Sequence, residues 1–117
     1  MSKQRDPKII LFEILDASRN IIEFKKAHSQ ESFEINLLLT SAVNYNLMII
    51  GEATKLLPVT FRNKYEEVSW KKMAGLRDIL IHQYHSTDSK NIWKIINTDI
   101  PTLIEKIEKI LSSLEAK

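Results

Sequence analysis

The segment INLLLTSAVNYNLMIIGEATKLLP (residues 35–58) gives the clearest indication of the fold. Its apolar side chains recur every three or four residues, the spacing that places them on one face of an α-helix. Pro58 ends the pattern, because proline has no amide hydrogen to continue a helix and disfavours a helical residue before it. The sequence therefore predicts a long core-facing helix over about Glu31–Leu57. Its expected core positions are Ile35, Leu38, Leu39, Ala42, Met48, Ile49, Ala53, Leu56 and Leu57.

Helical spacing also marks the segment before this helix. Asp6-Pro7 is typical of a helix start, with proline in the first turn, and predicts a helix over about Pro7–Lys26. Its apolar stripe consists of Leu11, Ile14, Leu15, Ile21 and Ile22. The polar segment Pro58–Val68 is expected to hold only a short turn of helix.

The second half of the chain shows the same alternation of helix and break. Ser69 is a candidate helix cap, because its hydroxyl can accept hydrogen bonds from free first-turn amides, and Ser86-Thr87-Asp88 supplies a break with a second cap. Thr98-Asp99 before Pro101 predicts a kink or the start of a fifth helix. The expected segments are Trp70–Tyr84, Ser89–Asn97 and Ile100–Leu114.

These segments together predict the fold class. Helices of this length with short connections predict an all-α fold, an antiparallel bundle of four to five helices. Two glycines and three prolines in 117 residues argue against a β protein, which needs frequent turns. We expect one domain over residues 1–117, with residues 1–6 and 115–117 loose.

Composition excludes several classes of protein. The chain has no cysteine, which excludes a disulfide scaffold, an iron–sulfur cluster and a cysteine nucleophile. Its apolar runs are too short to span a bilayer, and no signal peptide follows the charged N-terminus, so we expect a cytoplasmic protein. A net charge of +2 tolerates a polyanionic partner without requiring one.

One helical segment, GLRDILIHQYH (residues 75–85), differs from the rest because it combines an arginine, an aspartate and two histidines with an apolar arc. On an ideal helix Arg77 falls inside the apolar arc formed by residues such as Leu76, Leu80 and Tyr84. A guanidinium that faces the core is costly to desolvate, because it cannot readily give up its charge. We therefore expect Arg77 to meet a carboxylate (Glu52 or Glu13), a partner chain or an anionic ligand.

His82 lies near Arg77 in the sequence but not on the same face of the helix. Asp78 and His82 are four residues apart, so the carboxylate could orient the imidazole ring. Arg77 and His82 are about 140° apart around an ideal helix. They can meet at one phosphate only if the helix ends or bends near His82, or if two protomers pool their residues. The alternative role of His82 is a cation at the negative end of its helix.

These residues form the pattern Arg77-x-x-x-x-His82-x-Tyr84, which resembles the R-x-x-x-x-H-x-Y motif of the HepT-like toxins, a branch of the HEPN superfamily of helical ribonucleases. The flanking blocks are similar too and follow the same order. They are Ile50-Gly51-Glu52-Ala53, Leu57-Pro58, Trp70, Asp88, Trp93 and Asp99-Ile100-Pro101. The resemblance covers roughly Leu11 to Leu114.

The resemblance implies a homodimer with the motif helices facing across a cleft. It implies a metal-independent endoribonuclease without a cofactor, the toxin of a type VII toxin–antitoxin pair, with Arg77 and His82 as the catalytic pair. It also implies a partner nucleotidyltransferase of the MntA type, which silences such toxins by transferring AMP to the motif tyrosine, here Tyr84. Family members often have Asn where this chain has Asp78, so Asp78 is expected to play a supporting role and to affect the rate.

The chemistry fits these residue types. Cutting RNA without a metal needs a base for the 2′-hydroxyl proton and a cation for the charge on the phosphorane; imidazole suits the first task and guanidinium the second. The expected product is a 2′,3′-cyclic phosphate. Two alternatives remain open: a non-catalytic helical module that docks a nucleotidyltransferase and presents Tyr84 to it, and a plain structural dimer.

Several other residues allow both a functional and a structural interpretation. A zinc site can be drawn from Asp78, His82, His85 and Asp88, but we consider it a minor alternative. Trp70 and Trp93 suit the core or a dimer contact better than base stacking, and Lys71-Lys72 could guide RNA or simply be solvated. Gly51 inside a long helix predicts the close approach of another helix.

Overall fold

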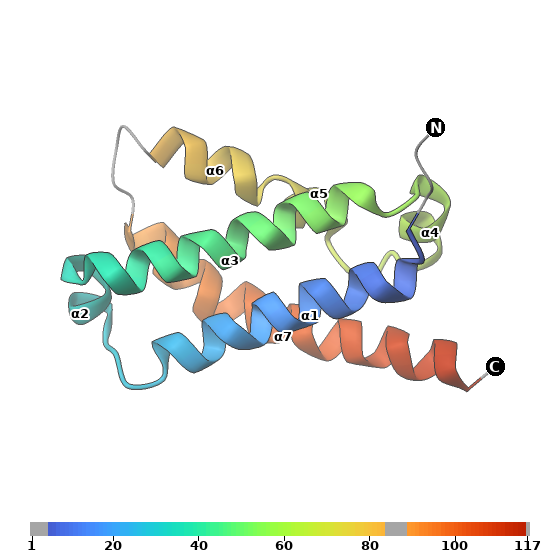
Figure 1. Cartoon of the computed structure of the whole chain (residues 1–117), viewed down its shortest axis with the longest axis horizontal. Helices are drawn as coiled ribbons and strands as arrows, with labels where there is room; N and C mark the ends of the chain where they lie inside the picture. Colours follow the sequence, from blue (N-terminus) through green and yellow to red (C-terminus); the bar gives the residue numbers. More distant parts are fainter. Residues whose placement is uncertain (1–4, 84–88, 117) are drawn as a thin grey trace.

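The computed structural model describes residues 5–83 and 89–116, of which residues 82 and 83 are described by their backbone alone. This part of the chain contains seven α-helices and no strand, which confirms the all-α prediction (Figure 1). The helices are α1 (Pro7–Lys25), α2 (Gln30–Ile35), α3 (Leu37–Leu56), α4 (Val59–Lys64), α5 (Trp70–Ala74), α6 (Leu76–Gln83) and α7 (Ser89–Glu115).

Three long helices, α1, α3 and α7, build the body of the molecule. They run along its length, and the start of α1 lies at the same end as the close of α7, whereas α2 lies at the opposite end (Figure 1). α1 packs against both α3 and α7, and α5 and α6 pack against α3. The fully buried side chains come mainly from the three long helices and include Ile14, Leu47 and Ile107.

The first helix forms as the sequence predicts. The Asp6 carboxylate caps it by accepting a hydrogen bond from the Lys8 amide at 2.9 Å, and Pro7 occupies the first helical position. Leu11 and Ile14 of the predicted stripe have no exposed surface. The short helix α4 also lies within the polar segment where one turn was expected.

The predicted helix over Glu31–Leu57 is wrong at Asn36, where the backbone leaves the helical region with φ −97° and ψ 95°. The Asn36 side chain accepts a hydrogen bond from the Leu39 amide at 3.0 Å and so caps α3. The interruption divides the predicted helix into α2 and α3 and changes the phase of the apolar face.

That change of phase makes part of the expected core exposed. Ile35 is 85% exposed and Leu38 is 82% exposed, so their assignment to the core is wrong. Met48 and Leu56 are exposed as well, whereas Leu39, Ala53 and Leu57 are buried as predicted. Val43, Leu47 and Ile50 supply the innermost apolar contacts of α3 instead.

Two expectations for the second half of the chain need correction. The predicted helix over Trp70–Tyr84 is divided at Gly75 into α5 and α6, and Ser69 precedes α5 without a side-chain capping hydrogen bond. A fifth helix does not begin at Ile100, because α7 continues as one helix through Pro101. Ile100 and Leu103 are both buried, so tertiary packing holds the helix together across the proline. In the described ranges, no helix is long and apolar enough to cross a membrane.

Candidate active site

The start of α6 is positioned by its close contact with α3 at Gly51. A Cβ atom on Gly51 would lie 3.2 Å from the backbone nitrogen of Arg77 and 3.4 Å from the backbone oxygen of Met73. A Cβ atom there would be in tighter contact with these backbone atoms than is usual, so the predicted close approach at Gly51 is confirmed. The same contact places Arg77 beside the residue that follows Gly51, which is Glu52.

Arg77 forms an ion pair with Glu52, in which its Nε atom lies 2.9 Å from Oε1 of the carboxylate. The side chains are 46% and 51% exposed, so this is a pair at the surface and not the buried one that the apolar arc suggested. The expectation of a core-facing arginine is therefore wrong. The other expected carboxylate, Glu13, pairs with Arg5 instead.

Among the described helices, α6 has its main contacts on one side. It packs against α3, and Figure 1 shows it on the side of α3 away from α1. Leu76 is buried, Ile79 and Leu80 are half-buried, and Ile81 is 50% exposed. Because its side chain is half in water, Arg77 is accessible to an anionic ligand.

The structure describes the other motif residues to different extents. Asp78 lies in the first turn of α6 and is exposed. The backbone of His82 belongs to α6, which is helical from Leu76 to Gln83. Arg77 and His82 therefore keep their separation of about 140° around one helix. The His82 side chain, and with it the predicted pairing to Asp78, lies outside the described residues. So do Tyr84 and the residues His85 and Asp88 of the minor zinc alternative.

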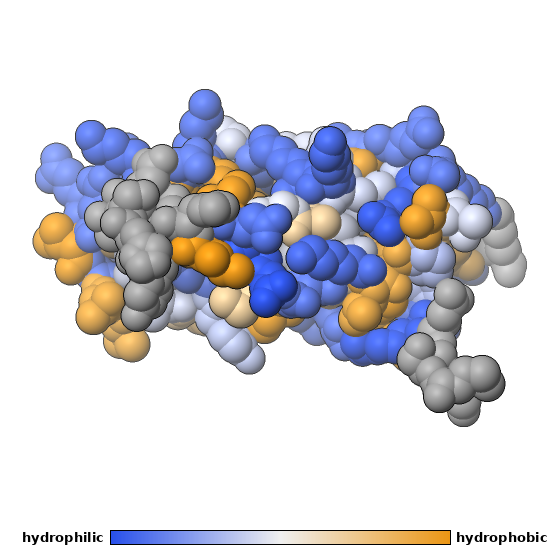
Figure 2. All heavy atoms as spheres, turned by 90° about the horizontal axis from the view of Figure 1, so that it is seen from above, coloured by the Kyte–Doolittle hydropathy of each residue, from blue (hydrophilic) through white to orange (hydrophobic). Residues whose placement is uncertain are grey.

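The face that carries α6 is chemically mixed. Figure 2 looks down on it and shows hydrophilic side chains between separate apolar ones. Lys71 is exposed, whereas Lys72 forms an ion pair with Asp99 at 3.0 Å. In the described part of the chain, no group of three or more His, Cys, Asp or Glu residues is arranged to hold a metal ion.

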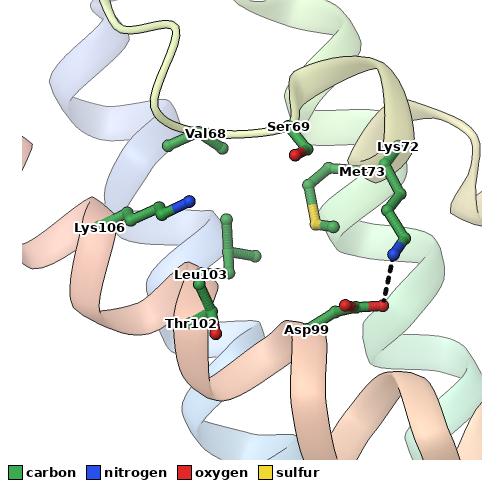
Figure 3. A pocket seen from close by; sticks show the side chains of 8 residues that line it. All are labelled: Val68, Ser69, Lys72, Met73, Asp99, Thr102, Leu103 and Lys106. Carbon is green, nitrogen blue, oxygen red and sulfur yellow. Dashed lines mark ion pairs between the residues drawn. The ribbon is translucent and has the colours of Figure 1, made fainter.

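The Lys72–Asp99 pair borders a small cavity of about 100 Å³ between α5 and α7 (Figure 3). Val68, Met73 and Leu103 form much of its wall, and the ammonium group of Lys106 points into it. The cavity is small and lies on the α7 side of α5, whereas Arg77 pairs with α3. The candidate active site is therefore the exposed surface at the α3–α6 contact and not this cavity.

The two tryptophans have structural contacts. Trp70 is 6% exposed, and its Nε1–H donates to the backbone oxygen of Tyr65 at 2.8 Å, which confirms its assignment to the core. Trp93 is half-buried, and its ring centroid lies 5.3 Å from that of Phe33. The Trp70 ring therefore presents no open face to a base, and Trp93 packs against Phe33.

Comparisons with known proteins give a consistent picture. A family model described as "Ribonuclease HepT-like" matches residues 14–110. A candidate RNase of Methanocaldococcus jannaschii is 42% identical over 92% of this chain and 98% of its own length. A protein called probable ribonuclease HepT, from Thermococcus cleftensis, is 38% identical over 92% of this chain and 97% of its own length. No solved structure matches the chain.

Proposed function

Because the chain belongs to the HepT-like ribonuclease family, we propose that it is the toxin of a type VII toxin–antitoxin pair and acts in the cytoplasm as a metal-independent endoribonuclease. The observation that supports this most directly is the exposed guanidinium of Arg77, the first residue of the family motif, on a helix fixed by Gly51. A permanently charged, solvent-accessible group of this kind suits an RNA phosphate.

The proposed reaction uses Arg77 and His82 and no cofactor. The His82 imidazole takes the proton from a ribose 2′-hydroxyl, and the resulting oxygen attacks the adjacent phosphorus. The guanidinium of Arg77 stabilises the negative charge that builds up on the phosphorane oxygens. The bond from phosphorus to the 5′-oxygen then breaks, the 5′-oxygen takes up a proton, and a 2′,3′-cyclic phosphate remains. Asp78 supports this step by orienting His82 from one turn earlier on α6.

We propose a homodimer as the active unit. The backbone positions of Arg77 and His82 lie about 140° apart around one helix, so we do not expect a single copy of α6 to aim both side chains at the same phosphate. Two copies of α6 that face each other across a cleft would bring Arg77 of one protomer toward His82 of the other. The half-exposed apolar side chain of Ile81, between them on α6, suits such a contact.

Silencing is assigned to Tyr84, two residues after His82. We propose that a nucleotidyltransferase of the MntA type transfers AMP to Tyr84: the tyrosine oxygen attacks the α-phosphorus of ATP and loses its proton, and pyrophosphate leaves. The added phosphate is negatively charged and bulky, and it would compete with RNA for Arg77. Co-production with a nucleotidyltransferase of the MntA type should add the mass of AMP to the protein, and Tyr84→Phe should abolish that addition. An unchanged mass beside an active partner would contradict this proposal.

The catalytic assignment is tested with purified protein and RNA in the presence of EDTA. Arg77→Ala and His82→Ala should each abolish cleavage while circular dichroism and the sedimentation coefficient stay unchanged. Lys109→Ala, an exposed site on α7, is a matched control that should cleave normally. Undiminished cleavage by a folded Arg77→Ala/His82→Ala double variant would reject the assignment.

The alternative function is a non-catalytic module that docks the nucleotidyltransferase. The Arg77–Glu52 pair favours this alternative, because the arginine already has a carboxylate partner. In that case RNA would stay intact at every protein concentration, and binding of the nucleotidyltransferase would survive Arg77→Ala.

A further inference from the structure

We propose that Glu52 is a positioning residue for the nuclease reaction, which holds the guanidinium of Arg77 by its Nε atom and leaves the far end of the guanidinium for an RNA phosphate. The inference rests on the proposed function and deepens it. Glu52 is outside the Arg-x-x-x-x-His-x-Tyr motif and belongs to a different helix, α3. The sequence gives Glu52 as one of two carboxylates that could neutralise Arg77 and as part of the flanking block Ile50-Gly51-Glu52-Ala53, without a role in the reaction.

The Glu52 side chain meets Arg77 at one particular nitrogen of the guanidinium group. Oε1 of Glu52 lies 2.9 Å from Nε of Arg77, which is the guanidinium nitrogen nearest the chain. A carboxylate at Nε occupies the side of the planar guanidinium group. The end of the group carries the two terminal amino groups, and this end can still donate two parallel hydrogen bonds to a phosphate.

The backbones of Glu52 and Arg77 are fixed at the same place, where α3 and α6 meet. Gly51 is buried at the closest approach of α3 to the start of α6, and its missing Cβ would lie 3.2 Å from the Arg77 nitrogen. Glu52 follows Gly51 directly, so its Cα is held relative to that of Arg77 by packed backbone. The ion pair then restricts the remaining freedom, which lies in the long arginine side chain.

The Arg77–Glu52 ion pair affects folding and catalysis to different degrees. Both side chains are about half exposed, and ion pairs in such positions contribute little to stability. The pair therefore does little for the fold. Its effect on catalysis is larger, because a group held in place before the reaction loses no freedom when charge develops on the phosphate. The half-exposed Glu52 carboxylate is screened by water, so its repulsion of the phosphate is weak.

The test compares Glu52→Ala with Glu52→Gln in the full-length protein. Glu52→Ala should lower kcat about 10- to 100-fold with a smaller change in KM, because the guanidinium is no longer held in the reactive position. Glu52→Gln should retain most of the activity, because its amide oxygen can still accept from the Arg77 Nε–H. Both variants should melt at the wild-type temperature. Equal losses in Gln and Ala, or activity in Glu52→Ala at or above the wild-type level, would overturn the inference.

Two controls separate this inference from the proposed function. Glu108→Ala removes an exposed carboxylate of the same kind, which pairs with Arg19 at 2.6 Å, and should cleave RNA normally. If Arg77→Ala itself cleaves RNA normally, the proposed function fails. If Arg77→Ala is inactive while Glu52→Ala is unaffected, only the positioning role fails.

Discussion

The backbone nitrogen of Arg77 lies so close to Gly51 that a Cβ atom added there would be 3.2 Å away from it. A glycine inside a helix costs about 1 kcal/mol relative to alanine, and this contact accounts for its presence in α3. The two other nearest atoms are the backbone oxygens of Met73 and Ala74, at 3.4 and 3.6 Å. The first residues of the candidate active site are thus positioned by backbone packed on backbone.

The first prediction concerns Gly51→Ala. The new methyl group would meet backbone atoms, which cannot turn aside as a flexible side chain can, so α6 must move by a few tenths of an ångström. We expect RNA cleavage to fall about tenfold, since small misplacements of a catalytic group are costly. The melting temperature should change little, because the gain in helix propensity offsets the tighter packing. Initial rates and thermal denaturation measure the two effects.

The control for this prediction is Gly75→Ala. A Cβ atom there would lie 3.4 Å from the Lys71 backbone oxygen and 3.5 Å from that of Lys72, which is ordinary van der Waals contact. Cleavage by Gly75→Ala should remain near the wild-type rate. Wild-type activity in Gly51→Ala as well would show that the Gly51 contact does not set the geometry of the site.

The second prediction concerns metal removal. The proposed reaction needs only the imidazole of His82 and the guanidinium of Arg77, so extensive dialysis against EDTA should leave the rate unchanged. Addition of Zn²⁺ or Mg²⁺ should give no stimulation beyond the general effect of salt on RNA binding. A metal-free preparation that regains cleavage only with a divalent cation would contradict the metal-independent mechanism.

The third prediction concerns Trp70. Its side chain is buried and its Nε1–H satisfies the backbone oxygen of Tyr65, so Trp70→Phe should lower the free energy of unfolding by about 1–3 kcal/mol. The KM for RNA should stay the same, because the ring is not available to a base. Chemical denaturation and steady-state kinetics on the folded variant check both parts. A raised KM with unchanged stability would instead indicate base stacking.

The sequence was sufficient to locate the helical regions, but not to predict how many helices they form or which residues they bury. Asn36 illustrates the difficulty. Its side chain can point to solvent within a helix or cap a new one, and the two local options differ by little free energy. Here it accepts from the Leu39 amide, and the resulting change of phase exposes Leu38. Pro101 shows the opposite case, since a local stop signal was overruled by burial on both sides of it.

The candidate site, like the fold, could be predicted only in part from the sequence. A helical projection places Arg77 on one arc with Leu76 and Leu80, but it cannot say how many neighbours cover that arc. Because α6 packs against α3 on one side, Leu76 is buried while the next residue, Arg77, is half exposed. The motif alone also does not predict a role for Glu52, because this residue lies outside it. The signal that points to it is its position directly after Gly51, the residue at which the helices meet.

The fourth prediction separates two neighbouring lysines. Lys71 is exposed and has no ion-pair partner in the described ranges, whereas Lys72 is engaged with Asp99. If Lys71 contacts an RNA phosphate, Lys71→Ala should reduce the slope of log affinity against log salt concentration by roughly one. Lys72→Ala should change that slope less. Fluorescence anisotropy with a single-stranded RNA measures both, and equal slopes for wild type and Lys71→Ala would assign Lys71 to a merely solvated surface.

The last prediction tests whether two protomers share each active site. When Arg77→Ala and His82→Ala chains are mixed with subunit exchange, a shared site would restore one intact Arg77–His82 pair in each mixed dimer. Since half the dimers are mixed and each has one of two sites intact, activity should recover to about a quarter of wild type. If each site instead uses Arg77 and His82 of the same chain, every site carries one substitution and no activity returns. Because α6 is helical from Leu76 to Gln83, the two residues lie on different faces of it, and we therefore expect recovery.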